Sequence, residues 1–175
     1  MKKILPFLSL VFLQSCLAQE IKTSNNTCEF SFEKLDPCSY QINSSPIIVT
    51  ITTTSIADDE KLIAQLVTNV NENSQILTVI ENTSLFEGDI GYVSFADINF
   101  DDVPDLAITT SFGTPNLYLD YWVFDSATRQ YVYVGNYSEF TLDKKNQTVT
   151  TTVKDAADSY TTTKWYWQGT ELNKK

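Results

Sequence analysis

The chain has 175 residues and is acidic, with 22 Asp and Glu residues against 12 Lys and Arg and a formal net charge of −10. Such a surface repels polyanions, which excludes DNA and RNA as partners. Histidine, the commonest catalytic acid or base, is absent, and only five residues are glycine. Neither a histidine-activated nucleophile nor a glycine-rich phosphate loop is therefore expected, and we predict a protein that is not an enzyme.

Residues 1–15 are typical of an export signal. Two lysines precede an apolar run, Ile4 to Leu13, which is too short to span a membrane as a mature helix. The run Leu13-Gln14-Ser15-Cys16 resembles a bacterial lipobox, in which Cys16 becomes the lipidated first residue. Cleavage by ordinary signal peptidase after Ala18 is the alternative. The signal predicts an exported, periplasmic protein, anchored to the bacterial outer membrane through lipid on Cys16.

The mature chain is expected to comprise a polar tether over residues 16–26 and a single β domain over 27–175. Without the two lysines of the signal, ten basic and 22 acidic residues remain, a net charge of −12 that suits a basic partner. Cys28 and Cys38 remain as a pair once Cys16 is lipidated or removed. Because an exported chain meets an oxidising compartment, a disulfide between them is expected, with two free thiols as the alternative.

The pattern of the remaining chain predicts an all-β fold. Strands are expected over 29–33 and 47–54, whereas residues 58–70 fit either a helix or a strand that pairs with 74–80. Further strand-like runs follow, at 90–96, 105–110, 118–124, 131–134, 148–154 and 161–167. Short strands separated by turns at regular spacing predict an antiparallel meander of short hairpins, forming a small propeller-like or barrel-like domain.

The stretch between two of these strands has the spacing of a calcium loop. Oxygen ligands are expected at relative positions 1, 3, 5, 7 and 9, from the side chains of Asp97, Asn99, Asp101 and Asp105 and the main-chain carbonyl of Val103. The sixth position, where glycine is usual because φ is positive, holds Asp102. No Glu stands at the twelfth position, so an EF-hand is not expected. The alternative is an Asx-rich turn without a metal.

Aromatic residues concentrate in the second half of the chain. Most are expected in the core and in cross-strand pairs. Trp165 and Trp167 are candidates for an exposed platform, the usual means by which a β module binds carbohydrate.

Four segments together resemble a known family: Val93–Leu106, Ser111–Asn116, Tyr118–Asp125 and Tyr131–Tyr133. They are similar to the exported lipoproteins related to immunity proteins of the cell-wall-lytic effectors of bacterial type IV secretion systems. Proteins of that family are β-propeller-like, carry an aspartate-rich calcium loop and resemble periplasmic lysozyme inhibitors. The resemblance covers about residues 88–170, and only the aspartate loop is a sharp motif.

The resemblance implies inhibition by a protruding loop whose Ser, Gly and Tyr enter the cleft of a muramidase. The closest match runs from Ser111 to Tyr118 and includes Gly113 and Asn116, although Phe112 interrupts the family's Ser-Gly start. An ordinary turn is the alternative for this segment. We thus expect a calcium-binding periplasmic lipoprotein that binds and inhibits a cell-wall hydrolase, lysozyme-like or a lytic effector. The alternative is a carbohydrate- or surface-binding β module with a structural calcium site and no inhibitory activity.

Overall fold

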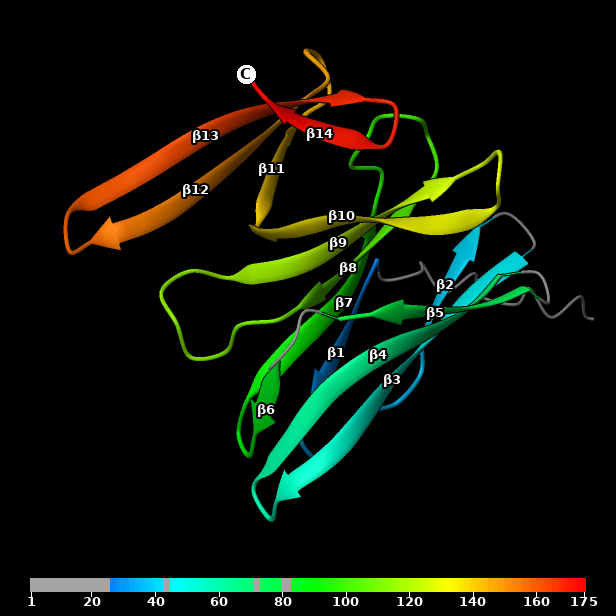
Figure 1. The fold of residues 1–175 in the computed structure, drawn as a ribbon, viewed down its shortest axis with the longest axis vertical. Coiled ribbons are helices and arrows are strands. Elements are labelled where there is room, and N and C mark those ends of the chain that lie inside the picture. The colour runs from blue at the N-terminus through cyan, green and yellow to red at the C-terminus, as the bar shows by residue number, and fades with distance from the viewer. Residues whose placement is uncertain (1–25, 43–44, 71–72, 80–82) are drawn as a thin grey trace, which may run out of the picture.

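The computed structural model describes residues 26–42, 45–70, 73–79 and 83–175. The predicted export signal, Cys16 and nearly all of the predicted tether lie outside these residues. The described residues form fourteen strands and no helix, so none of them belongs to a helix that is long and apolar enough to cross a membrane (Figure 1). The predicted all-β fold is confirmed.

The strands form three antiparallel sheets rather than one closed barrel in the part of the chain described here. The central sheet has the order β1 (Thr27–Ser31), β7 (Ile90–Ala96), β8 (Asp105–Thr109), β9 (Tyr118–Asp125), β10 (Gln130–Ser138). The β2–β6 sheet contains β2 (Cys38–Ile42), β3 (Ser45–Ala57), β4 (Glu60–Val70), β5 (Asn73–Thr78) and β6 (Ser84–Phe86), the last paired with β4. The C-terminal sheet contains β11 (Phe140–Asp143), β12 (Thr148–Ala156), β13 (Ser159–Gln168) and β14 (Glu171–Lys174).

Residues 58–70, which the sequence left open, form a turn followed by β4. This strand pairs with β3 on one side and β5 on the other, and Leu66 lies opposite Leu77 with both side chains buried. The strand alternative is therefore correct, because β4 lies in the middle of its sheet and packs one face on the core.

Other sheets cover both faces of the central sheet. Buried residues in β9 are therefore consecutive, instead of alternating with exposed ones. Trp122 packs toward the β2–β6 sheet in a first core, and Tyr121 and Val123 pack toward the C-terminal sheet in a second. Every residue of β8 is buried. The aspartate loop and the Ser111–Tyr118 loop, at the two ends of β8, are therefore joined by a strand that is buried along its whole length.

The expected disulfide is present. It joins Cys28 on β1 to Cys38 on β2, with 5.7 Å between the Cα atoms, and so links the central sheet to the β2–β6 sheet. The Cys38 side chain is buried in the first core.

Candidate functional site

The aspartate-rich loop joins β7 to β8 and folds around the carboxylate of Asp97. The backbone N–H groups of Asp101 and Asp102 donate to its two oxygens, at 2.9 and 3.2 Å. The Asp101 carboxylate in turn accepts from the N–H of Val103 at 2.9 Å and from the Asn99 amide at 2.9 Å. The side chains of the predicted ligands therefore curl the backbone of this loop inward.

Two non-glycine residues of the loop have a positive φ. Asp102 lies at 63°, the conformation for which calcium loops usually use glycine at this position, and Phe100 lies at 65°. A side chain makes the left-handed region unfavourable by roughly 1 kcal/mol or more per residue, and Asp tolerates it better than most residues. Asp102 thus takes the backbone conformation that the spacing requires, at some cost in strain.

Asp105 connects this loop to the core. Its side chain is 1 % exposed and accepts from the backbone N–H groups of Ile98 at 2.9 Å and Phe124 at 2.8 Å. Burial raises the pKa of Asp105 from 3.8 to about 7, the two hydrogen bonds oppose this shift, and the nearby charge of Asp101 adds to it. The loop therefore contains a carboxyl group that is costly to ionise unless a positive charge lies beside it.

The donor set of the loop suits a hard cation, since it consists entirely of oxygen. Each carboxylate oxygen has two lone pairs, so a hydrogen bond from the backbone leaves capacity for a metal. Among the described residues, however, no three acidic or cysteine side chains converge into a ready-made metal-ligand group. Calcium binding by Asp97, Asn99, Asp101, Asp105 and the Val103 carbonyl stays a prediction, and it requires these ligands to move closer together.

The second predicted site, Ser111–Tyr118, is the loop between β8 and β9, which extends away from the sheets on the left of Figure 1. It lies at the opposite end of β8 from the aspartate loop. Five residues of strand separate the two, about 15 Å at the usual rise per residue. A calcium ion in the aspartate loop would thus not contact the Ser111–Tyr118 loop directly.

The side chains at the base of the Ser111–Tyr118 loop hold its shape. The Ser111 hydroxyl donates to the Asn116 carbonyl at 3.1 Å and accepts from the Tyr118 N–H at 2.8 Å. Phe112, which departs from the family's pattern, packs edge-on against Phe30 of the first core, with 6.2 Å between ring centroids. The insertion therefore anchors the loop rather than disrupting it.

Asn116 ties the same loop to the C-terminal sheet. Its side-chain amide donates to the backbone carbonyl of Lys154 at 3.1 Å and accepts from the Lys154 N–H at 2.7 Å. Gly113, at the tip, has φ 65° and open space around the position of a Cβ. Ser111 and Asn116 are thus used to build the loop. Of the other two predicted contact residues, Gly113 is exposed at the tip and Tyr118 is half-buried at the start of β9.

A hollow of about 300 Å³ lies beside this loop, between it and the β12–β13 hairpin. Its lining mixes polar and apolar groups and includes Asn116, Glu139, Thr152, Lys154 and Tyr160. Tyr160 is 61 % exposed, and the Lys154 ammonium lies 5.9 Å from its ring centroid. The sequence pattern does not predict this hollow, because its lining comes from three separate parts of the chain.

Trp165 and Trp167, the candidates for an exposed carbohydrate-binding platform, pack against neighbouring side chains. Trp165 donates its indole N–H to Thr151 at 2.9 Å and lies edge-on to Tyr137 at 5.2 Å. Trp167 packs against the second core. Both are half-buried, so Tyr160 is the aromatic residue of this hairpin that is best placed to meet a ligand.

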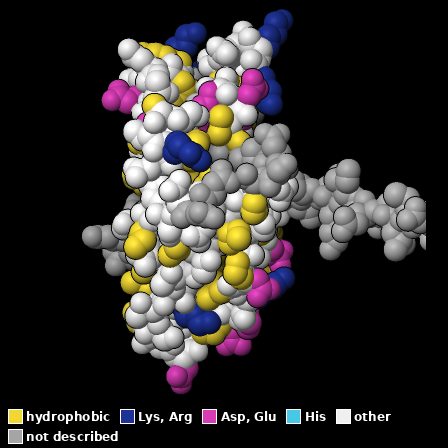
Figure 2. Space-filling view, turned by 90° about the vertical axis from the view of Figure 1, so that its right-hand side faces the viewer, with side chains coloured by type: hydrophobic (Ala, Val, Ile, Leu, Met, Phe, Trp, Pro, Cys, Tyr) yellow, Lys and Arg dark blue, Asp and Glu magenta, His cyan; other side chains and the backbone are white. Residues whose placement is uncertain are grey.

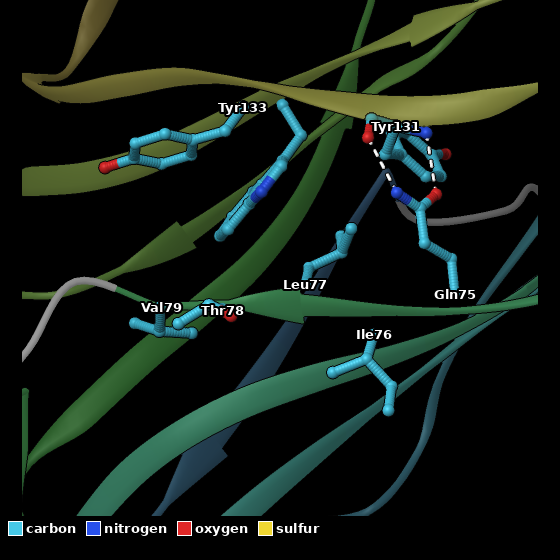
Figure 3. A pocket seen from close by; sticks show the side chains of 8 residues that line it. Gln75, Ile76, Leu77, Thr78, Val79, Tyr131 and Tyr133 are labelled. Atoms are coloured by element: carbon cyan, nitrogen blue, oxygen red, sulfur yellow. Dashed lines mark hydrogen bonds between the residues drawn. The ribbon is translucent and has the colours of Figure 1, made fainter.

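A larger hollow, of about 470 Å³, lies between β5 and the strands β9 and β10 (Figure 3). Gln75 closes one end of it, because its amide donates to the carbonyl of Tyr131 and accepts from the N–H of Tyr131, both at 2.7 Å. Figure 3 shows Leu77 pointing toward the hollow and Ile76 away from it. Leu77, Val79, Trp122 and Tyr131 of its lining belong to the first core, so the hollow lies where the β2–β6 sheet packs on the central sheet.

The chain matches no protein-family model, no curated protein and no solved structure at a significant level of similarity.

Proposed function

We infer that this chain is an exported, lipid-anchored periplasmic protein that binds and inhibits a cell-wall hydrolase without chemistry of its own. The observation that carries the proposal is the Ser111–Tyr118 loop. It extends from the sheets, and three contacts fix its base: Phe112 on the core, the Ser111 hydroxyl within the loop and Asn116 on β12. A loop already held in one shape loses less conformational entropy when it binds, so more of its contact energy appears as affinity.

The proposed mechanism is occlusion. The tip at Gly113 and the ring of Tyr118 would enter the substrate cleft of the hydrolase, where they compete with the glycan chain. Tyrosine is a typical anchor residue because it buries a large ring while ordering few rotatable bonds. The acidic composition supports a basic partner, because opposite charge speeds the encounter of two proteins.

Calcium in the aspartate loop would have a structural role. The ion would offset the repulsion among Asp97, Asp101 and Asp105 and keep the buried carboxyl of Asp105 ionised. Since the Asp105 side chain is bonded to the N–H of Phe124, this would stiffen the β7–β8 end of the central sheet. The partner surface lies at the other end of β8.

The proposal is tested by titrating the purified full chain into muramidase assays that span lysozyme types and bacterial lytic effectors. We expect at least one enzyme to be inhibited stoichiometrically at micromolar concentration or below. If none of them is slowed, the inhibitor proposal fails.

A second candidate function is a carbohydrate-binding module, favoured by the exposed Tyr160 beside the hollow of about 300 Å³. A sugar ring would stack on Tyr160, while Glu139 and Lys154 would bind its hydroxyl groups. Calorimetry with soluble peptidoglycan fragments tests it. Heat of binding that is lost in Tyr160→Ala and kept in Tyr118→Ala would favour this function over inhibition.

A further inference from the structure

The strands β5 and β10 are edge strands of two different sheets. β5 ends the path β2-β3-β4-β5, and β10 is the last strand of the central sheet. The Gln75 side chain of β5 binds the backbone of Tyr131 on β10, and the hollow of about 470 Å³ lies beside this bridge (Figure 3). Within the described residues, no strand pairs with either of these two edges. The two edges therefore face each other across the hollow.

The backbone groups of β5 alternate between its two edges. The N–H of Val79 donates to the Ala64 carbonyl at 3.4 Å, and the Gln75 carbonyl accepts from a β4 hydroxyl at 3.3 Å, so both groups face β4. Backbone groups of successive residues in an antiparallel pair point alternately toward and away from the partner strand. Ile76 and Thr78 therefore direct their N–H and C=O groups to the free edge. Hydrogen bonds from these groups to other described residues are absent.

The Gln75 bridge shows how a peptide group fits between β5 and β10. Its amide donates to the Tyr131 carbonyl and accepts from the Tyr131 N–H, both at 2.7 Å, as the backbone of a neighbouring strand does. By the same alternation, Tyr133 also turns its backbone away from β9 and toward the hollow. Its side chain lines the hollow and is 47 % exposed. A polypeptide backbone in the hollow would thus continue the pairing that Gln75 begins.

The lining of the hollow suits a polypeptide better than a small molecule. Leu77, Val79, Trp122 and Tyr131 are each at most 4 % exposed, because their side chains pack in the first core. The ring of Tyr133 and the strand edges are what a ligand would contact. Unpaired donors and acceptors that recur along a strand edge are the groups to which an extended peptide binds in strand addition.

β5 lacks the features that usually prevent an edge strand from pairing. Asn73–Thr78 contains no proline and no charged side chain, and it pairs with β4 without a register shift. The edge strands of the C-terminal sheet, by contrast, carry Asp143 on β11 and Glu171 and Lys174 on β14. Figure 2 shows acidic side chains toward the two ends of one face, with mostly uncharged groups between them. The edge of β5 is thus open to pairing in an otherwise acidic protein.

We propose that β5 binds an extended, uncharged segment of another protein by strand addition, at a place here called the strand-addition site. The backbone of the segment pairs with Ile76 and Thr78, and its side chains pack on the ring of Tyr133. None of the eight lining residues is charged, so a charged side chain there would lose its hydration without gaining a partner. This inference is independent of the proposed inhibition.

A single segment fits the strand-addition site better than a second copy of the chain does. In a second copy, β10 likewise faces the free edge of β5 and the Gln75–Tyr131 bridge joins the two strands. Two copies therefore cannot pair through their β5 edges without opening both hollows, whereas one extended segment can enter a hollow as it stands.

The test follows hydrogen exchange of single amides by NMR in the full chain, with a blocked heptapeptide of alternating valine and serine as the probe. In the free chain the N–H groups of Ile76 and Thr78 should exchange fast, whereas that of Leu77, which faces β4, should exchange slowly. Peptide at ten times its Kd should slow exchange at Ile76 and Thr78 about 10-fold, because about one-tenth of the molecules remain free. The control peptide is N-methylated at two adjacent central residues, so neither of its edges can pair.

Thr78→Pro blocks the edge from the protein side, because proline has no N–H. The Thr78 N–H takes no part in the pairing with β4, so the variant should keep its fold, as prolines on edge strands do. It should raise the Kd of the peptide at least ~10-fold. Thr78→Ala keeps the N–H and is the matched control, with a Kd expected to stay within about 2-fold of the wild type.

Protection of Ile76 and Thr78 by the peptide, without protection by its methylated form, would support the strand-addition site. Unchanged exchange at millimolar peptide would overturn it, and so would equal binding of the methylated peptide, which would assign the contact to side chains alone. Dimers of the free chain that Thr78→Pro dissociates, without peptide binding, would make a second copy the occupant and reject the proposal. If Thr78→Pro does not fold, the comparison of the two peptides still decides.

Discussion

The side chain of Asn116 pairs with the backbone of Lys154 as a neighbouring strand would. Its amide nitrogen donates to the Lys154 carbonyl at 3.1 Å, and its amide oxygen accepts from the Lys154 N–H at 2.7 Å. The loop between β8 and β9 is thereby joined to β12 of another sheet without a strand of its own. Because the amide bonds both the N–H and the carbonyl of Lys154, the two hydrogen bonds fix the orientation of the loop against β12 as well as its distance from this strand.

The same device recurs between Gln75 and Tyr131. The Gln75 amide binds the N–H and the carbonyl of Tyr131, both at 2.7 Å, and so joins β5 of the β2–β6 sheet to β10 of the central sheet (Figure 3). Each outer sheet is thus joined to the central sheet by one side-chain amide. The Asn116 amide joins the β8–β9 loop to the C-terminal sheet, and the Gln75 amide joins the β2–β6 sheet to β10.

We predict that Asn116→Ala lowers the free energy of unfolding by about 1–2 kcal/mol, because it leaves a half-buried N–H and carbonyl without their partner. The Lys154 amide should also exchange its hydrogen faster. Thermal melting and hydrogen exchange measure the two effects.

Thr114→Ala is the matched control for Asn116→Ala. Its hydroxyl donates to the Asn116 carbonyl at 2.6 Å within the exposed loop and touches no other sheet. Its effect on stability should stay within about 0.5 kcal/mol. Equal losses in the two variants would show that the bridge to β12 is unimportant.

Calcium in excess should stabilise the wild-type chain. An ion that binds the folded state alone adds about 2.7 kcal/mol at a concentration of 100 times its Kd. Asp101→Asn keeps an oxygen acceptor for the N–H of Val103 but removes one negative charge. It should therefore melt like the wild type, or slightly higher, in chelator and lose most of the gain in calcium.

Asp143→Asn, at the end of β11, is the control for Asp101→Asn and should leave the response to calcium unchanged. Calorimetry gives the stoichiometry, expected to be one ion per chain. The calcium site would be rejected by an absence of binding heat together with identical melting of all three proteins with and without the ion.

The chelator-treated chain should lose stability as the pH rises from about 4 to about 7. In this window Asp105 ionises in the unfolded chain, whereas its folded pKa is raised to about 7 by burial. The unfolded state therefore binds fewer protons, so the free energy of unfolding falls with pH and levels off above the folded pKa. Each unit of pKa difference corresponds to about 1.4 kcal/mol.

Asp105→Asn isolates this effect in urea titrations across the same pH range. The variant should be less stable overall, because an amide cannot accept from both Ile98 and Phe124, but its stability should lose most of the slope between pH 4 and 7. A slope that persists in the variant would assign the pH dependence to other groups.

Replacement of both Cys28 and Cys38 by Ala should lower the free energy of unfolding by about 3 kcal/mol, the chain-entropy value for a loop of this size. Reduction of the wild type should have a similar effect, and reductant should leave the double variant unchanged. Melting curves with and without reductant measure this. Equal melting of the wild type with and without reductant, together with equal melting of the double variant, would contradict a stabilising role of this disulfide.

The sequence predicts most of the long strands, the aspartate loop and the Ser111–Tyr118 loop. Alternating apolar residues and turn residues mark these features within a few consecutive positions. It missed the four short strands β2, β6, β11 and β14, which have three to five residues each. Strands of this length carry too few alternations to stand out. They form because a long neighbour, such as β3 for β2, offers an unpaired edge.

The helical spacing in residues 58–70 has a specific cause. Ile63 and Leu66 are both buried although they stand three positions apart, which an unbroken strand would not allow. Register shifts between Thr52 and Thr53 of the partner strand, so Gln65 and Ile63 face consecutive residues and Ala64 is left over. A β-bulge therefore imitates the periodicity of a helix, and sequence alone cannot separate the two.

Only those parts of the candidate site whose residues are close together in the sequence could be predicted. The aspartate loop was found from its spacing within nine residues, whereas the Asn116–Lys154 bridge spans 38 positions and the Gln75–Tyr131 bridge spans 56. No periodicity joins residues so far apart. The hollow at Tyr160 was missed for the same reason.

Tyr118→Ala should weaken binding to the inhibited hydrolase by ~2 kcal/mol or more, about 30-fold in Kd, as truncation of an interface anchor does. Its melting should be nearly unchanged, because the bonds that place this residue are made by its backbone. Its N–H donates to the Ser111 hydroxyl and its carbonyl accepts from the Thr110 N–H, and both survive in alanine.

The matched control for Tyr118→Ala is Tyr166→Ala, an exposed tyrosine of β13 away from the loop, which should bind as the wild type does. Titration calorimetry with the hydrolase and a melting curve of each variant give both readouts. Tyr160→Ala separates the two candidate surfaces, since Tyr160 lines the neighbouring hollow. If Tyr160→Ala weakens binding while Tyr118→Ala does not, the partner contacts the β12–β13 hairpin and the loop only supports it. If both weaken binding, the hydrolase spans the loop and the hollow together.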